Sequence, residues 1–432
     1  MKVTIFWFRR DFRLEDNAGL YFALKSKYPV LPVFIFDTNI LNDLSEKKDR
    51  RLTFIYNRIQ LLQEQLIDFG SSLKCLYSSP VEAFERLMSE YDIAEVITNK
   101  DYEPYANERD EAIAALLAKH KIAFKKYKDQ VIFEQNEIVK EDGTPYVVFT
   151  PYSKKWKEKL NDFYLKSYPV LRYKNNFFQT EPFAIPSLSD IGFTSCEDIF
   201  PLNSIDEQLI AHYNETRDIP GIDGTTRLGL HLRFGAVSIR KLAKVALHVN
   251  DTFLNELIWR EFFMMILWHY PRVVHTSFRQ EYDNIQWRNN EQEFESWCEG
   301  KTGYPIVDAG MRELNATGFM HNRVRMIAAS FLCKHLLIDW RWGEAYFAEK
   351  LLDYDLSANN GNWQWAAGCG CDAAPYFRIF SPQRQTEKFD PDLIYVRKWV
   401  PELETFNYPQ PIVNHIFARE RCLATYKKAL QQ

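Results

Sequence analysis

The sequence lacks long hydrophobic runs, a recognisable leader and a framework of paired cysteines. No stretch of about 18 consecutive apolar residues occurs, which argues against a membrane-spanning helix. The first residues, MKVTIFWFRRDFRLED, contain too short an apolar run for a secretory signal, and acidic residues follow at once. The seven cysteines are odd in number and scattered, which is typical of reduced cytosolic thiols. We therefore expect a cytoplasmic protein that does not contact membranes.

Three further features have little diagnostic power by themselves. Cys369 and Cys371 form a C-x-C pair, but no second close pair supplies further ligands, so we interpret both as packing residues and predict no metal site. The net charge is only −4, which does not exclude DNA as a partner, because nucleic acids bind to a local basic face. The 11 tryptophans suit a core, a stacking surface or a cofactor wall, and composition does not distinguish these uses.

The N-terminal part alternates short apolar runs with helical patterns. The expected strands are residues 3–8, 30–36, 73–77 and 95–98, and the expected helices are 17–27, 50–69, 80–91 and 107–119. This alternation predicts a mostly parallel, doubly wound, Rossmann-like sheet. No G-x-G-x-x-G and no P-loop follows the first strand, so we predict no dinucleotide or triphosphate site in this part.

The length of 432 residues exceeds what one hydrophobic core usually serves, so we expect more than one domain. Residues 1–128 form the predicted α/β domain. Periodicity fades over 129–204, which we interpret as a connector on the surface of both domains. From 205 to 432 the pattern is helical, as in residues 253–270, which end at a proline, and residues 324–337. The predicted fold is an α/β domain followed by an all-α domain.

Three segments of the helical part carry candidate chemistry. Residues 224–238 hold glycine, threonine and Arg227, which suit a phosphate at a helix start, although an ordinary turn capped by threonine is the commoner outcome. Glu256 and Trp259 share one helical face as a substrate-facing pair or, as spacing alone favours, as a solvated glutamate beside a core tryptophan. In residues 300–326, a helix start carries Asn322, Arg323, Arg325 and Met326, whose basic groups suit phosphate contact or a solvated surface.

The segment 351–382 gives the strongest signal. It combines acids, amides, glycines, two tryptophans and an arginine, and it is too polar for a core and too aromatic for a plain loop. Such a mixture is what a buried polar heterocycle requires.

These four segments, in this order, resemble the FAD-binding domain of DNA photolyases and cryptochromes. The resemblance extends from FWFRRDFRLEDN at the N-terminus to WVPEL near residue 403. It is closest to class I cyclobutane pyrimidine dimer (deoxyribodipyrimidine) photolyases, because Met326 and the Trp363–Gln364–Trp365 run match them. A (6-4) photolyase is expected to carry a second histidine after His321, where this chain has Asn322. Only about thirty residues follow WVPEL, which leaves no long signalling tail.

The resemblance implies that FAD, active as FADH−, binds in the helical domain. The implied contacts are Tyr213, Thr225, Thr226, Arg227, Leu228, Gly229, Phe253, Arg325, Asp353, Tyr354, Asp355 and Asn359. Asn359 takes the position beside flavin N5, and Arg325 pairs with Asp353 near the flavin. The N-terminal domain is expected to hold an antenna chromophore, a folate (methenyltetrahydrofolate) or a deazaflavin, with Asn107 and Glu108 at positions that contact folate in some relatives.

The implied activity is light-driven repair of cyclobutane dimers by electron transfer from excited reduced FAD to a flipped-out lesion. The implied catalytic residues are Glu256, Trp259, Asn322, Met326, Asn359 and Trp365. An electron relay would use Trp287, Trp340 and Trp363. Contacts with UV-damaged DNA would use Arg217, Glu256, Trp259, Asn322, Arg323 and Gln385. We expect a monomer that binds DNA without base-sequence specificity. The alternatives are a cryptochrome-type blue-light photoreceptor and a (6-4) photolyase.

Overall fold

The computed structural model describes residues 2–431, which fall into two compact units. The first unit takes the chain up to Glu134, and adds residues 160–205 and 227–245. The second unit takes residues 135–159 and 206–226 and everything from Ala246 onward. Within the predicted connector, residues 135–159 therefore belong to the helical unit, and residues 129–134 and 160–204 belong to the sheet-containing unit. Each unit is described by itself below.

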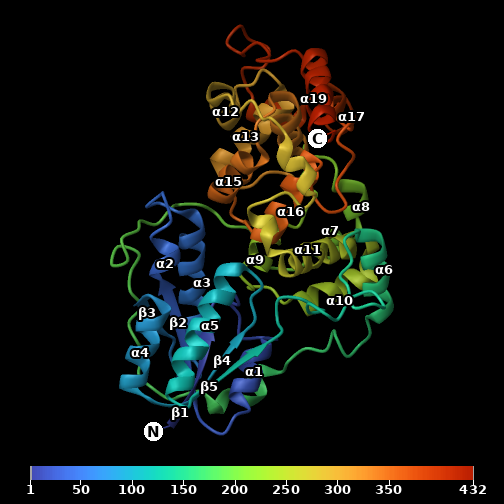
Figure 1. The fold of residues 1–432 in the computed structure, drawn as a ribbon. Helices are drawn as coiled ribbons and strands as arrows, with labels where there is room; N and C mark the ends of the chain where they lie inside the picture. The colour runs from blue at the N-terminus through green and yellow to red at the C-terminus, as the bar shows by residue number, and fades with distance from the viewer. Residues whose placement is uncertain (1, 432) are drawn as a thin grey trace. The chain divides into compact units, whose positions relative to one another are not determined.

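The first unit is built on a sheet of five parallel strands in the order β3-β2-β1-β4-β5 (Figure 1). The strands are β1 (Lys2–Phe8), β2 (Val30–Asp37), β3 (Lys74–Ser78), β4 (Asp92–Asn99) and β5 (Ala123–Tyr127). Four of them match predicted strands. The edge strand β5 was not predicted, because its sequence AFKKY carries two lysines and is only partly buried, so no apolar alternation marks it.

Helices cover both faces of this sheet. On one face Phe6 and Phe8 of β1 pack with side chains of α1 (Ala18–Leu24) and α3 (Arg50–Ile67). On the other face Val3, Ile5 and Trp7 pack with α4 (Pro80–Glu90) and α5 (Pro104–Lys119). Successive strand residues point to opposite faces, so β1 supplies both cores. The doubly wound parallel sheet predicted from the alternating pattern is confirmed. The short helix α2 (Thr38–Leu41), the 3-10 helix η1 (Val170–Asn176), α9 (Gly229–Arg233) and the start of α10 (Ile239–Val249) complete the unit.

The second unit is helical, as predicted. Its helices are α6 (Phe149–Lys159), α7 (Glu207–Ala211), α8 (Tyr213–Thr216), α11 (Asp251–His269), η2 (Pro271–Val274), η3 (Gln280–Asn284), α12 (Glu291–Cys298), α13 (Pro305–Thr317), α14 (Asn322–Ser330), the π-helical turn η4 (Phe331–Leu336), α15 (Trp340–Lys350), α16 (Leu356–Ala367), α17 (Pro382–Phe389), α18 (Ile394–Trp399) and α19 (His415–Ala429). Helix α11 ends just before Pro271, which cannot continue it.

Helix α6 lies within the stretch predicted as a surface connector, and it was not predicted. Its sequence FTPYSKKWKEK has four lysines, so Tyr152 and Trp156, four residues apart, give too weak a periodic signal. Both side chains are nevertheless buried against α11. The Trp156 indole Nε1 donates a hydrogen bond of 2.6 Å to the buried carboxylate of Glu261. This contact fixes α6 against α11 within the second unit.

Two glycines allow α11, α15 and α16 to approach one another closely. A Cβ at Gly361 of α16 would lie 2.1 Å from Cδ1 of Phe263 on α11. A Cβ at Gly343 of α15 would lie 2.1 Å from the Trp363 ring on α16. Side chains at either position would force the helices apart, so both glycines fix the geometry of the walls described below.

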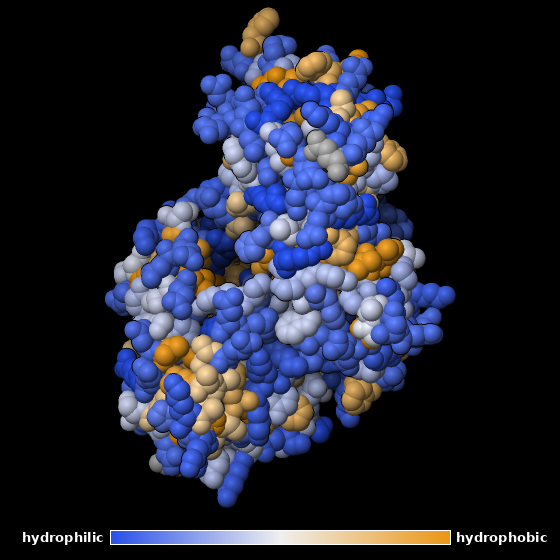
Figure 2. Space-filling view, in the orientation of Figure 1, coloured by the Kyte–Doolittle hydropathy of each residue, from blue (hydrophilic) through white to orange (hydrophobic). Residues whose placement is uncertain are grey.

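Large hydrophobic side chains are exposed at several places, among them Phe163, Ile199 and Phe406. In the face displayed in Figure 2, hydrophilic side chains predominate and hydrophobic ones occur in small separate groups. Among residues 2–431, none of the helices is both long and apolar enough to cross a bilayer.

Candidate active site

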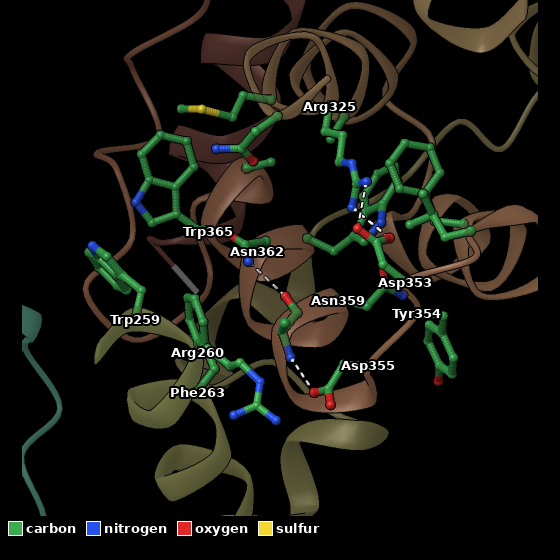
Figure 3. A pocket seen from close by; sticks show the side chains of 18 of the residues that line it. Trp259, Arg260, Phe263, Arg325, Asp353, Tyr354, Asp355, Asn359, Asn362 and Trp365 are labelled. Atoms are coloured by element: carbon green, nitrogen blue, oxygen red, sulfur yellow. Dashed lines mark hydrogen bonds and ion pairs between the residues drawn. The ribbon is translucent and has the colours of Figure 1, made fainter. Parts of the chain in front are cut away.

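A cavity of about 360 Å³ opens in the helical unit, within the size range of small-molecule sites. Helices α11, α14 and α16 and residues 351–355 supply most of its lining (Figure 3). All six predicted catalytic residues line it, namely Glu256, Trp259, Asn322, Met326, Asn359 and Trp365. So do the predicted cofactor residues Arg325, Asp353, Tyr354 and Asp355. Residues that are about a hundred positions apart in the sequence thus line the same cavity.

Trp259 forms an aromatic wall that is held in place from behind. Its ring is stacked on Phe149 with centroids 3.7 Å apart and planes 4° apart, and Phe263 lies 5.4 Å away. The Phe149 backbone N–H donates to the Asp372 carboxylate at 3.1 Å. Neither Phe149 nor Asp372 was predicted, because no local pattern connects residues 110 or more positions from their partners. Figure 3 shows Trp365 beside Trp259 on the same side of the cavity.

Replacing Phe149 with alanine is expected to loosen the Trp259 wall. Stacked aromatic pairs contribute about 0.5–1.5 kcal/mol beyond area burial, so binding of the expected substrate, dimer-containing DNA, should weaken about two- to twelvefold. Fluorescence anisotropy with a labelled oligonucleotide measures this change. Phe163, which is 78% exposed, provides a matched control. An unchanged affinity in Phe149→Ala, or an equal loss in Phe163→Ala, would contradict this support role.

Glu256 lies on α11 at the edge of the cavity and is paired with Arg217. The Arg217 Nη1 donates to the Glu256 carboxylate at 2.6 Å. Burial raises the pKa of the Glu256 carboxyl above its usual value, although the Arg217 charge opposes this shift. Glu256 is therefore neither a solvated surface glutamate nor an isolated buried acid.

The first turn of α14 places three predicted residues together. Asn322 is exposed at the first helical position, and Met326 lies one turn later on the same face. Arg323 does not line the cavity, but its guanidinium contacts the Met326 sulfur at 3.7 Å and the Asp218 carboxylate at 2.7 Å. Gln385, on α17, lies outside the lining.

Arg325 and Asp353 form a two-pronged ion pair in the cavity wall. The two guanidinium nitrogens donate to the two carboxylate oxygens at 3.1 and 2.9 Å. Arg325 Nε also donates to the Met320 carbonyl at 2.7 Å, which fixes its plane. The predicted pairing of these residues is therefore present in the structure.

Asn359 presents one side of its amide to a neighbouring helix. Its Nδ2 donates to the Glu344 backbone carbonyl at 3.0 Å. Among residues 2–431, no group donates to its Oδ1, so the carbonyl side of this amide can accept a hydrogen bond from a ligand in the cavity. The Glu344 carboxylate accepts from Asn360 at 3.0 Å, and burial raises the pKa of Glu344 to about 7. Glu344 was not predicted, since nothing in its sequence neighbourhood marks it.

The side chains present suit a flavin. An isoalloxazine ring has apolar faces and an edge of alternating donors and acceptors. The unmatched Oδ1 of Asn359, the Arg325–Asp353 pair and the aromatic lining supply complementary groups. The Asp355 carboxylate accepts from the Ala358 N–H at 3.3 Å and thereby caps α16, which orients the helix that carries Asn359 and Trp363.

Other predicted cofactor residues lie elsewhere. Tyr213 and Phe253 contact each other edge-on at 5.1 Å in the helical unit, outside the lining. Thr225 and Thr226 belong to the helical unit, whereas Arg227, Leu228 and Gly229 belong to the sheet-containing unit, and none of these five lines the cavity. The predicted phosphate role of this segment stays a prediction.

The three relay tryptophans pack into or against one hydrophobic cluster. Trp363 is buried and lines the cavity. Trp340 is buried at the first position of α15, one turn before Gly343, where α15 touches the Trp363 ring. Trp287 is half-buried and lies 6.0 Å from the ring of Tyr426. Their use as a relay stays a prediction.

Part of the segment 351–382 serves the core. The Gln364 side chain is buried, donates to the Val273 carbonyl at 2.9 Å and accepts from the Phe278 N–H at 2.7 Å. Asn360 donates to the same Val273 carbonyl at 3.0 Å. These two amides hold backbone in place, so the expectation that this segment is too polar for a core is wrong for them.

The sheet-containing unit has a cavity of its own, of about 200 Å³. It lies at the carboxyl ends of β1, β2 and β4, where α/β folds commonly bind ligands. Trp7, Phe34 and Phe36 supply apolar lining, and Arg9 and Arg109 supply positive charge. Asn107 and Glu108, the predicted antenna residues, lie on α5 between two lining positions but do not line the cavity themselves.

Two family models match separate parts of the chain. Residues 4–171 match the family model described as DNA photolyase, and residues 253–407 match the FAD binding domain of DNA photolyase. The second match contains every residue of the helical-unit cavity except Arg217.

Individual relatives match over the full length. The deoxyribodipyrimidine photo-lyase of Halobacterium salinarum is 35% identical, over 99% of both chains. A bacterial class III photolyase from Agrobacterium tumefaciens has a similar structure, with a TM-score of 0.89, 32% identity and coverage of 100% of this chain and 98% of that one. An archaeal photolyase from Sulfolobus tokodaii, solved with two FAD molecules, has a TM-score of 0.82, 34% identity and coverage of 99% and 100%. The chain therefore belongs to the DNA photolyase family, whose FAD-binding domain its helical unit contains.

Proposed function

We propose that the protein repairs cyclobutane pyrimidine dimers in DNA in a light-driven reaction. The observation that carries this proposal is one cavity that combines groups suited to a flavin with groups suited to a flipped-out pyrimidine dimer. Asn359 and the Arg325–Asp353 pair represent the first set, and Trp259, Trp365 and Glu256 the second. The full-length likeness to a deoxyribodipyrimidine photo-lyase supports the same activity over that of a photoreceptor.

When bound, reduced FAD supplies the light-excited electron that opens the dimer ring, and it receives the electron back. The protein contributes the pocket into which the lesion is turned. A dimer is poorly stacked and paired, so its extrusion from the duplex costs less than that of normal bases. Trp259 and Trp365 offer aromatic surfaces to the dimer, and Met326 fills the gap beside them.

Two polar groups recognise the edges of the dimer. The Asn322 amide hydrogen-bonds to a carbonyl or N–H of the bases. Glu256, whose pKa is raised by burial, has a neutral form that donates a hydrogen bond or a proton to a dimer carbonyl as negative charge develops there. Charge stabilisation at this point favours ring opening over unproductive return of the electron.

Positively charged residues near the mouth of the cavity bind the DNA backbone. Arg217 is a lining residue, and Arg323 lies next to Met326. Contacts of this kind neutralise phosphates without reading bases, so a monomer binds damaged DNA irrespective of sequence, with an affinity that falls as salt rises.

The test is repair of a defined oligonucleotide that contains one thymine dimer, by reduced protein, under blue light and in darkness. Loss of dimers in light alone is the expected result. Repair of an oligonucleotide with a (6-4) lesion instead would favour the (6-4) alternative, and photoreduction without any repair would favour a photoreceptor. The (6-4) outcome is disfavoured by Asn322, which replaces the second histidine expected of those enzymes.

The cavity of the sheet-containing unit is the proposed antenna site. Its aromatic lining suits a planar chromophore, and its arginines suit an anionic substituent. The Sulfolobus tokodaii photolyase was solved with two FAD molecules, with the implication of a novel light-harvesting cofactor in that protein. A folate or a deazaflavin remains the prediction from the sequence.

Filling this cavity is expected to remove the antenna and leave FAD bound. Ala106 is buried in α5 and lines the cavity, whereas Ala118 of the same helix is exposed. Ala106→Trp should lose the non-FAD absorbance of the purified protein, while Ala118→Trp keeps it. Retention of that absorbance in a folded Ala106→Trp variant would contradict this location.

A further inference from the structure

Four charged groups form a chain at the edge of the helical-unit cavity. Glu256 on α11 accepts from Arg217 at 2.6 Å, and Arg217 Nε lies 3.8 Å from the carboxylate of Asp218. Asp218 accepts from the Nη2 and Nε of Arg323 at 2.7 and 3.2 Å. Charges alternate along this chain, so each arginine is held by acids in the absence of DNA.

Both arginines remain accessible to a phosphate. The Arg217 side chain is 25% exposed and that of Arg323 is 17% exposed. Aromatic faces support them from one side, since Arg217 lies over Tyr213 and Arg323 over Phe389. A guanidinium stacked in this way keeps its donors directed along its edge, where a phosphate binds with two parallel hydrogen bonds.

The same arrangement controls the charge of Glu256. Its surroundings contain the attractive charge of Arg217, the repulsive charge of Asp218, the Tyr213 hydroxyl, and Arg260 on its own helix, which also lines the cavity. Arg217 is the group that favours the ionised form, whereas burial and Asp218 favour the protonated form. Loss of the Arg217 contact therefore removes the charge and the hydrogen bond that oppose protonation of Glu256.

We propose that Arg217 and Asp218 form a phosphate-operated switch that places a proton on Glu256 when DNA binds. A backbone phosphate attracts the guanidinium groups of Arg217 and Arg323, and the Arg217–Glu256 and Arg323–Asp218 pairs open. Glu256 then takes one proton from solvent, and Asp218, freed of its partner, disfavours its release. The lesion thus meets a neutral carboxyl that is able to donate. This switch rests on the proposed function, because it prepares Glu256 for that reaction.

The sign of the pH dependence follows from linkage. The complex binds more protons than the free protein, so affinity for DNA falls as pH rises between the pKa of Glu256 in the free protein and its higher pKa in the complex. Uptake of one proton changes the affinity by at most about tenfold per pH unit.

The experiment is calorimetric titration with a thymine-dimer oligonucleotide in buffers of different ionisation enthalpy, which gives the number of protons taken up. The wild-type holoprotein is expected to take up as much as about one proton per complex. Glu256→Gln should take up none. Arg217→Gln should take up fewer protons than the wild type, because removal of the Arg217 charge raises the pKa of Glu256 before DNA arrives. Asp218→Asn should also take up less, since the repulsion that raises the pKa of Glu256 is removed.

Two controls test whether the proton uptake comes from Glu256 and depends on the DNA phosphates. Arg86→Gln opens an exposed ion pair with Glu90 in the sheet-containing unit and should leave the uptake unchanged. An oligonucleotide whose linkages around the dimer are uncharged methylphosphonates should bind more weakly and without proton uptake. Uptake that persists in Glu256→Gln or with uncharged linkages, or that disappears in Arg86→Gln, would overturn the switch.

The proposed function is tested separately by illuminating the same samples and measuring the loss of dimers. Wild-type protein that repairs dimers but binds DNA without proton uptake would contradict the switch and leave the function intact. Protein that takes up the proton but repairs nothing in light would contradict the function and leave the switch intact.

Discussion

Trp363→Phe is expected to slow light-driven reduction of the oxidised flavin by at least about tenfold, which corresponds to about 1.4 kcal/mol in the barrier. Trp363 alone among the three predicted relay residues lines the cavity, so an electron from Trp340 or Trp287 would have to pass it. Phenylalanine is much harder to oxidise than tryptophan and keeps most of the packing. Absorbance changes under continuous blue light with an external reductant measure the rate.

The same variant separates photoreduction from repair. Once the flavin is reduced chemically, Trp363→Phe should repair dimers within about twofold of wild type, because repair needs no electron from outside. Trp297 is an informative control, since it is fully buried and lies 6.1 Å from Trp363, but is not among the predicted relay residues. Equal slowing in Trp297→Phe, or normal photoreduction in Trp363→Phe, would contradict the predicted route.

Arg325→Met and Asp353→Leu are each expected to lose FAD. The two side chains are 23% and 21% exposed, so removal of one leaves the other charge largely buried and unpaired. With allowance for partial exposure, the expected loss is about 2–3 kcal/mol in binding, or roughly 30- to 150-fold in affinity. Retention of flavin through gel filtration and titration of the apoprotein both measure it.

Two comparisons test whether loss of the Arg325–Asp353 ion pair is what causes the loss of FAD. Combining Arg325→Met with Asp353→Leu removes both charges and should recover part of the loss in protein stability, though not the flavin contacts. Arg288→Met breaks a comparable two-pronged pair with Glu293 in the same unit, outside the cavity, and should keep FAD. Full flavin content in either single variant would show that the pair is dispensable.

The sequence predicts the parts of the site that are local in the chain. Asn322 and Met326 lie on one helical turn, and Asn359, Trp363 and Trp365 lie on another helix, so motif spacing alone gathers them. The parallel sheet is likewise predictable, because β1 and β2 are mostly apolar runs and weaker apolar stretches at β3 and β4 alternate with helical patterns. Strand β5 and helix α6 are missed because lysines interrupt their apolar pattern.

The supporting groups are not predictable from local pattern. Phe149 reaches Trp259 from a different helix, and Glu344 reaches Asn359 through its backbone carbonyl, which any residue type supplies. The role of Gly343 is visible only when the Trp363 ring lies against it. Such contacts depend on how the helices cross, and the local pattern of a single sequence does not reveal these crossings.

The most direct test of the central claim is the fluorescence of the reduced flavin with and without dimer-containing DNA. Electron transfer to a dimer held in the Trp259–Trp365 pocket competes with emission. We predict that an oligonucleotide with one thymine dimer shortens the fluorescence lifetime markedly, whereas the same oligonucleotide without the dimer leaves it unchanged. An unchanged lifetime at a dimer concentration that saturates binding would contradict the claim that this cavity brings flavin and lesion together.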